Sequence, residues 1–478
     1  MNGGIRLGLS LPVFLGSLIA MFVGTFTGLL GIWLFLAWKI AVPEWIKVGH
    51  AHASWWSVLL VIAALLVPGL PLRPGAKRFI TITALVAVPL WLIELGAYYV
   101  SKVARGALPA LPPRPGEEFS PEYLAYGTGI FVTELWFFAA LLLVFLTALG
   151  IRQPRLTQGT AAPSARELLT DIEIPRQAVL VPVLVMPLGL IVGWAMTLAF
   201  KARGLPIQPA ALVQLHSHTF FFIVGYLMTL IVMRAVGASE RIFRLTFRLG
   251  QVAIPLIVLG YLLFIGLRLP SVAVVIPALL YFVVLGLGLA ALFGGFGVGA
   301  KARRVGSLTS SYLRKAMAFT WALMILLVAV GPVMQLRWDT APDVTVTYRQ
   351  PEGAPYPGPY PEKYIGTAPV AGTPRGLENL HLSPGSWTHA ALFWLLALLL
   401  AWDRIGPAVG APGLLFLAAT TIPLAPFFNA VGRVAAWANL PNGSGALWFA
   451  GHPLKMFNQI VLIVLVATAM RKIKAADR

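Results

Sequence analysis

The sequence predicts an all-α polytopic membrane protein with about 12 transmembrane helices. Of the 478 residues, 58% are hydrophobic and only 11% are charged, whereas a soluble globular chain has about 25% charged residues. The mean hydropathy is +0.83. Apolar runs long enough to cross a bilayer recur along the chain. The first run, about residues 8 to 38, is too long for the apolar core of a signal peptide and is expected to be a span.

Twelve apolar segments can be placed in order, and the segments 102–122 and 151–176 between them are expected to be linkers. The tenth segment is short, which allows an earlier start, and the eleventh contains several Gly and Pro residues. The predicted spans are 11–38, 50–70, 79–101, 123–150, 177–200, 212–236, 248–267, 271–296, 312–335, 386–402, 406–427 and 445–470.

The distribution of Lys and Arg predicts the orientation of the chain in the membrane. The segments on the side of the N-terminus hold 22 basic residues and those on the other side hold 13, while Lys455 lies inside the last span. Basic residues favour the cytoplasmic side. We therefore expect a prokaryotic inner-membrane protein with both termini in the cytoplasm. The net charge of +19 is then explained by this bias and by attraction to anionic lipid, and no nucleic-acid partner is expected.

All histidines of the chain fall at the predicted outer side. Two open the second span in an H-x-H pair, two open the sixth span in the same way, and one opens the tenth. Another lies in the loop before the tenth span, and the last lies in the first third of the twelfth. In chain order they are His50, His52, His216, His218, His381, His389 and His452.

The histidine segments repeat at intervals of four helices. "HAHASWWSVLLVIAALLV" and "HSHTFFFIVGYLMTLIV" share a pattern, and their first histidines are 166 positions apart. Aligning His389 with His218 gives a third copy 171 positions later, in which Trp387 replaces the first histidine. This spacing predicts three four-helix pseudo-repeats arranged as a pseudo-threefold bundle. The expected units are 1–150, 151–305 and 306–478, the last with an outer Pro- and Tyr-rich loop at 336–385.

The H-x-H spacing indicates what these histidines could bind. Residues i and i+2 of an α-helix point about 200° apart, so such a helix fits between two sites, each completed by another helix. Haem takes one axial imidazole from each of two helices, and imidazole also binds copper and non-haem iron. The chain has no Cys, which excludes thiolate sites and c-type haem attachment. The alternative is that these histidines lie in the hydrated headgroup region of the membrane, beside a belt of aromatic residues.

The topology and the segment "GHAHASWW" resemble the haem–copper oxidase superfamily, including its nitric oxide reductases and the related NnrS-type membrane proteins. The resemblance implies a low-spin haem, b-type, held by His50 or His52 together with His389. It implies that His216 or His218 faces a second centre of copper or non-haem iron.

The chain also departs from that superfamily. Its H-x-H pairs lie on the second and sixth helices instead of the tenth, and its seventh helix lacks the adjacent His-His pair. Phe220 and Phe222 stand where the oxidases have a Tyr, and "WFAGHP", similar to their W-x-x-G-H-P run, lies on the twelfth helix. These differences favour electron transfer or nitric oxide chemistry over reduction of dioxygen to water. His452 remains a candidate metal ligand because of its depth.

Four charged residues complete the candidate site. Glu94 and Glu134 lie inside spans, where a carboxylate is a candidate metal ligand or proton relay, or the partner of a neighbouring helix. Lys455 could pair with a haem propionate or with Glu134. Arg433 could also bind a propionate, although an ordinary loop arginine is the simpler interpretation.

Two classes of function follow. The first is a membrane haem protein, an oxidoreductase that transfers electrons or reduces a small gas such as nitric oxide or dioxygen. It would need a partner redox subunit or a soluble donor on the outer side, where the loop 336–385 could dock it. The second is a 12-helix secondary transporter, for which internal repeats are common. Transporters place polar residues near the midplane, whereas these histidines share one outer layer.

Overall fold

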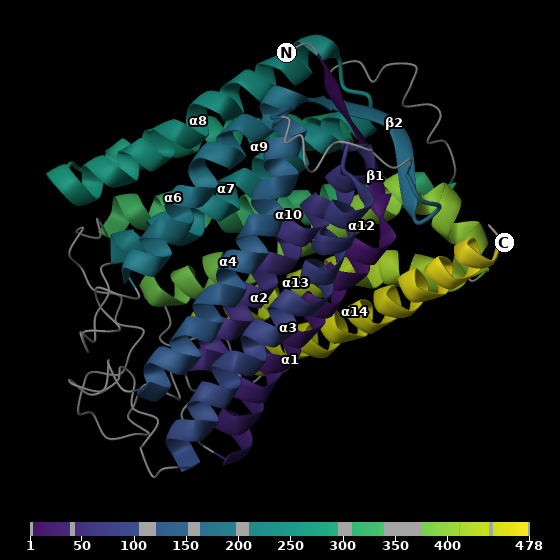
Figure 1. Cartoon of the computed structure of the whole chain (residues 1–478). Coiled ribbons are helices and arrows are strands. Elements are labelled where there is room, and N and C mark those ends of the chain that lie inside the picture. The colour runs from purple at the N-terminus through teal and green to yellow at the C-terminus, as the bar shows by residue number, and fades with distance from the viewer. Residues whose placement is uncertain are drawn as a thin grey trace.

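The described residues of the chain fold into a bundle of twelve long α-helices with one small two-stranded sheet (Figure 1). The structure is a computed structural model that describes residues 3–38, 44–104, 121–151, 163–196, 210–294, 308–338, 374–410, 412–438 and 443–476. Eleven of the described helices are long and apolar enough to cross a membrane. The prediction of an all-α polytopic membrane protein is therefore confirmed.

Most of these helices are apolar runs, and an α-helix satisfies its backbone hydrogen bonds internally, as a membrane requires. The helices are α1 (Leu11–Trp38), α2 (Glu44–Leu66), α3 (Pro74–Ala104), α4 (Pro121–Leu149), α6 (Leu180–Met196), α7 (Ala210–Ala235), α8 (Glu240–Leu267), α9 (Val272–Leu292), α10 (Leu308–Trp338), α12 (Pro374–Val409), α13 (Pro412–Trp437) and α14 (Gly443–Ala476). Short 3-10 turns, η1 (Val67–Gly69) and η2 (Arg176–Val179), follow α2 and precede α6.

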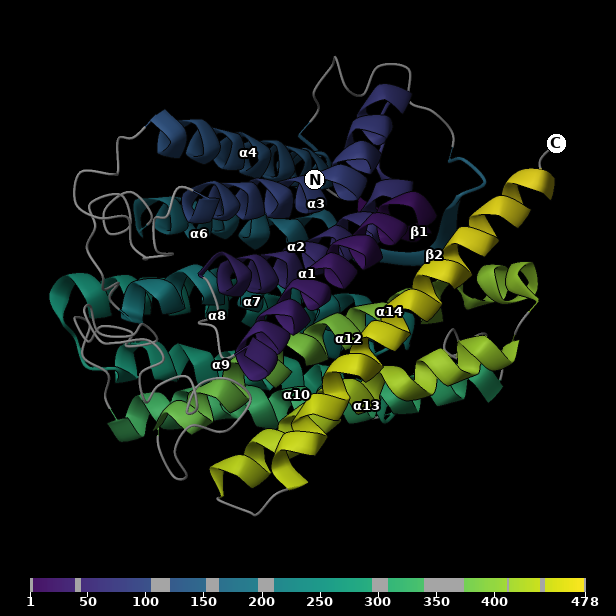
Figure 2. The ribbon, with the colours of Figure 1, turned by 90° about the horizontal axis from the view of Figure 1, so that it is seen from below.

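The helix contacts repeat three times around the bundle. In each group of four, the first helix contacts the second and third, the second also contacts the third and fourth, and the third contacts the fourth. The last helix of one group packs on the first of the next, through α4 with α6, α9 with α10, and α14 with α1. Figure 2 shows α14 along the outside of the bundle beside α1 and α13. The ring of groups is therefore closed.

The second helices of the three groups, α2, α7 and α12, contact one another at the centre. The spans in α2 and α7 have 83% of their residues buried, compared with 39–56% for the other spans that were found. All the histidines except His452 lie on these three helices. The fold therefore places the histidines in the interior of the bundle, away from lipid.

The helix that carries the tenth predicted span is longer than expected. Its apolar span, Gly385–Val409, begins within one residue of the predicted start at 386, but α12 itself begins at Pro374, so residues 374–385 belong to α12 and not to the predicted outer loop 336–385. His381 is consequently helical, and His389 lies near the start of the span but in the middle of α12. The eleventh predicted segment, 406–427, corresponds to α13, which begins and ends later, at Pro412 and Trp437. The remainder of that loop, 339–373, and the unit boundary at 305 lie outside the described residues.

The sheet was not predicted. Strand β1 (Gly4–Ser10) pairs antiparallel with β2 (Glu167–Pro175), which lies in the predicted linker 151–176. In β1, alternate apolar residues (Ile5, Leu7 and Leu9) are buried, which is the pattern of a half-buried strand. Both strands lie at the end of the bundle where α1 begins (Figure 1). A buried ion pair of 2.8 Å between Lys77 of α3 and Glu167 fixes β2 to the first group.

Gly69 is the tightest point of this junction. A Cβ on Gly69 would overlap the carbonyl oxygen of Arg6 in β1. We expect Gly69→Ala to destabilise the protein by about 1–3 kcal/mol, the usual cost of overpacking, measured by thermal unfolding in detergent. The matched control is Gly286→Ala in α9, where a Cβ would meet nothing within 4 Å. Equal unfolding temperatures for the two variants would contradict the described junction.

Candidate functional site

Three histidines occupy equivalent positions in the three helix groups. Each lies on the second helix of its group and makes a hydrogen bond through Nδ1 to a carbonyl oxygen of the first helix. The carbonyl is that of Gly24 for His50 (2.8 Å), Gly189 for His216 (2.7 Å) and Leu327 for His381 (3.0 Å).

A glycine follows each of these carbonyl residues by four positions and makes room for the ring. A Cβ on it would come within 2.5 Å of Nδ1 of His50, 2.6 Å of Cε1 of His216 or 3.0 Å of Cε1 of His381. Such approaches are closer than side chains tolerate, so each imidazole fills the place that a side chain would take. The glycines are Gly28, Gly193 and Gly331.

The third member of the repeat is therefore His381, and the predicted alignment of His389 with His218 does not hold. His216 follows His50 by 166 positions, and His381 follows His216 by 165. This near-identical spacing was visible in the sequence. The polar segment around His381, with Pro384 and Gly385, is typical of a loop and conceals the repeat. In the sequence, Ser383 stands two positions after His381, where the first two groups have their second histidine.

The second histidines of the first two groups reach across to the next group. The ring centres of His52 in α2 and His216 in α7 are 5.9 Å apart, and this is the first pair. The rings of His218 in α7 and His381 in α12 are also 5.9 Å apart, and this is the second pair. The two histidines of α7 thus face different neighbouring helices, as the i, i+2 spacing predicts.

The hydrogen bonds of these rings determine which nitrogen could bind a metal. His52 and His218 bond through Nδ1 to the carbonyls of Val48 and Gln214 in their own helices, at 2.9 and 2.8 Å. A carbonyl oxygen can only accept, so Nδ1 of every paired histidine carries the hydrogen. Each Nε2 then keeps its lone pair. This is the orientation in which a backbone carbonyl supports a metal-ligating imidazole.

The first pair has a carboxylate close by. The ring of Trp91 lies 5.4 Å from that of His52, and its Nε1 donates to Oε1 of Glu134 at 3.1 Å. Trp194 donates to Oε2 of the same carboxylate at 2.7 Å. Two indole donors therefore stabilise a charge within the span of α4. That Trp91 and Trp194 share this partner could not be inferred from the sequence, because they lie on different helices, α3 and α6.

The second pair is surrounded by aromatic rings. Tyr261 and Phe222 lie 5.7 and 5.6 Å from His218, and Phe221 lies 6.4 Å from His381. Aromatic side chains therefore line the second pair.

Among the described residues, the ring of His389 contacts Trp55 and Phe221 and no histidine of either pair. It is fully buried, with Nδ1 bonded to the Gly385 carbonyl at 2.8 Å. Its ring lies 4.3 Å from Phe221 and 5.9 Å from Trp55. It thus lies between the three central helices, and its Nε2 has no hydrogen-bond partner within the described part of the chain. The low-spin site of His50 or His52 with His389 stays a prediction.

His452 and Lys455 lie on α14, which packs on α1 of the first group. The ring of His452 lies 4.6 Å from Trp387, and Nζ of Lys455 lies 4.2 Å from the centre of the same indole. In α13, Nε of Arg433 donates to Oδ1 of Asn429 at 3.0 Å. The pairing of Lys455 with a haem propionate or with Glu134 stays a prediction.

Glu94 of α3 is joined to α4. Its Oε1 accepts a hydrogen bond of 3.2 Å from Thr133 in α4, and its other oxygen has no partner among the described residues. Glu134 is connected to the first histidine pair through Trp91.

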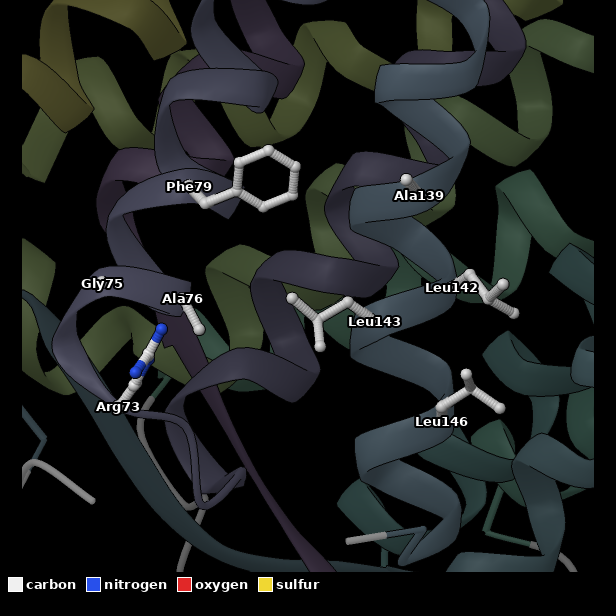
Figure 3. A pocket seen from close by; sticks show the side chains of 8 residues that line it. All are labelled: Arg73, Gly75, Ala76, Phe79, Ala139, Leu142, Leu143 and Leu146. Atoms are coloured by element: carbon white, nitrogen blue, oxygen red, sulfur yellow. The ribbon is translucent and has the colours of Figure 1, made fainter. Parts of the chain in front are cut away.

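A shallow groove of about 450 Å³ lies between α3 and α4 (Figure 3). Arg73 is its only charged lining residue, and the others are glycine, alanine, phenylalanine and leucine. It lies where α3 begins, near the sheet, and holds no histidine or carboxylate. It offers no chemistry of its own.

The described residues contain no group of three or more His, Cys, Asp or Glu side chains that could hold a metal ion. What the site offers is pairs of imidazoles from neighbouring helices. The chain matches no protein-family model, no curated protein and no solved structure.

Proposed function

We propose that this chain is a membrane haem protein that transfers electrons through centres held between its helix groups. The observation that carries the proposal is the pair of cross-group imidazole contacts, each 5.9 Å between ring centres, with every Nδ1 bonded to a backbone carbonyl. Two imidazoles that bind one ion from opposite sides have ring centres roughly 6 Å apart, given a metal–nitrogen bond of about 2 Å.

The number of protein ligands favours haem over a bare metal ion. Structural zinc sites use four protein ligands and catalytic sites three, and no such group occurs among the residues that the structure describes. Haem iron takes four nitrogens from its own porphyrin and needs only one or two axial ligands from the protein. Copper or non-haem iron would need a further ligand at either pair.

The surroundings suggest a role for each pair. The second pair lies beside Phe221, Phe222 and Tyr261 and suits electron transfer alone. Beside the first pair, Glu134 is held by two indoles and can accept a proton when the charge of the centre changes. When haem is bound, it supplies the one-electron chemistry. The chain positions its ligands and moves the proton.

The proposal extends the resemblance to the haem–copper oxidase superfamily, with the ligands taken from different helices. We further propose that the termini are cytoplasmic in a prokaryotic inner membrane, as the basic residues indicate. The histidine layer then lies toward the outer side, where a soluble donor or a partner redox subunit would deliver electrons.

The visible spectrum of the purified chain tests this proposal. We expect a Soret band and sharp α-bands on reduction, with a haem-to-protein ratio above one. Two imidazoles saturate the iron, so carbon monoxide should leave the reduced spectrum unchanged. A carbon monoxide shift would assign small-gas chemistry to that centre, as nitric oxide or dioxygen reduction requires an open position. Protein that stays colourless after expression with excess haem would favour the secondary transporter.

A further inference from the structure

The interface between the third and first groups differs chemically from the two that hold histidine pairs. It contains Trp387 from α12, Asn429 and Arg433 from α13, and His452 and Lys455 from α14, the helix that packs on α1 of the first group. We call these five residues the cationic interface. It holds two basic side chains, of which Lys455 is buried and Arg433 is half-buried.

The buried ammonium of Lys455 is the main evidence for a ligand at this interface. Its side chain is 2% exposed, and Nζ has no hydrogen-bond partner within the described residues. The indole face of Trp387 lies 4.2 Å away and attracts the ammonium, but it offers no acceptor to the three N–H groups. An unpaired buried ammonium is strongly unfavourable in a membrane protein. An anion bound beside it would remove that cost.

Asn429 provides a second, independent donor. It is fully buried, and its Oδ1 accepts from Nε of Arg433 at 3.0 Å. That bond fixes the amide so that Nδ2 is the free end, and Nδ2 also has no partner among the described residues. The guanidinium adds a planar set of donors that suits oxygen pairs.

We infer that the cationic interface binds a small oxyanion, with Lys455, Asn429 and Arg433 as its donors. This inference is independent of haem binding, because the interface offers an excess of donors and positive charge, whereas each histidine pair offers Nε2 lone pairs. The proposed ligand comes from solution. It is a small carboxylate or an inorganic oxyanion, and it is not a propionate of the proposed haem.

Calorimetric titration of the full chain in detergent tests the inference. The probes are sodium acetate, sodium nitrite and sodium phosphate, at constant chloride, so that carboxylate and inorganic oxyanions are distinguished. We expect saturable binding of at least one probe, weakened about tenfold or more in Lys455→Met, the usual effect of losing a charged hydrogen bond. Lys472→Met on the exposed end of the same helix is the matched control and should bind like wild type.

Thermal stability provides a second test. Lys455→Met is expected to weaken anion binding without lowering the unfolding temperature of the anion-free protein. Without added anion, Lys455→Met should unfold at the same or a higher temperature than wild type, because an unpaired charge has been removed. With the bound probe, only wild type should be stabilised. If Lys455→Met does not fold, Arg433→Gln is compared with Arg404→Gln, an exposed control in α12.

Three results would overturn the inference. The first is wild-type protein that binds none of the probes. The second is equal affinity in wild type and in both interface variants. The third is binding that appears only after haem is extracted, which would show that the cations hold the carboxylates of the cofactor. The haem content is measured on the same samples, so that failure here is separated from failure of the proposed electron-transfer function.

Discussion

Replacing either member of a histidine pair is expected to remove the same haem. His52→Ala and His216→Ala lie on different helices but share the first pair. Each should weaken that haem by more than roughly 100-fold, since even an outer-shell change at a metal site costs 10–100-fold. Their reduced-minus-oxidised spectra should lose the same component, and the double variant should lose nothing further.

The second pair provides the control for this experiment. His218→Ala and His381→Ala should together affect another spectral component and leave that of the first pair in place, because their rings contact each other. If His52→Ala and His216→Ala affect different components, or if His389→Ala removes the component that His52→Ala removes, the pairing is wrong. The latter result would restore the site implied by the resemblance.

The second large effect is expected at Gly193, which is not itself a ligand of the proposed centre. A Cβ at this position would lie 2.6 Å from Cε1 of His216. The ring would have to move and would lose its hydrogen bond to the Gly189 carbonyl. We expect Gly193→Ala to lower haem affinity at the first pair by about 10–100-fold, the range for losing a ligand's supporting group, measured by haem titration of the apoprotein.

Gly286→Ala is the matched control for Gly193→Ala, since it also places an alanine in a membrane helix but meets nothing within 4 Å. It should retain the wild-type haem affinity. Gly331→Ala should affect only the second pair, because Gly331 adjoins His381. A Gly193→Ala protein with unchanged haem affinity would show that the position of the His216 ring does not matter for binding.

The sequence is sufficient for the helices but not for all of their ends. Eleven apolar runs are strong enough to be found from hydropathy alone, because a membrane leaves few alternatives to a helix. The start of α12 could not be found in this way. The stretch before residue 386 is polar and contains Pro384 and Gly385, which are typical of loops. Strand β1 was hidden because its apolar residues merge with those of α1.

The candidate histidines could be identified from sequence, but not their partners. The H-x-H spacing correctly indicates that His216 and His218 face different helices. The pairing of His218 with His381 depends on how α7 packs against α12, which sequence spacing cannot give. The carbonyls that orient the rings leave no trace in the side chains, although the glycines four positions later, such as Gly28 and Gly193, are a usable sign.

A density map of the chain purified from its own membranes, at a resolution that separates side chains, would show whether haem lies between the paired histidines. We predict flat density between His52 and His216, with Nε2 of each ring pointing into it and Nδ1 of His216 still bonded to the Gly189 carbonyl. The second pair should show the same arrangement. Imidazoles packed directly on each other with no density between them, in protein shown to contain haem, would contradict it.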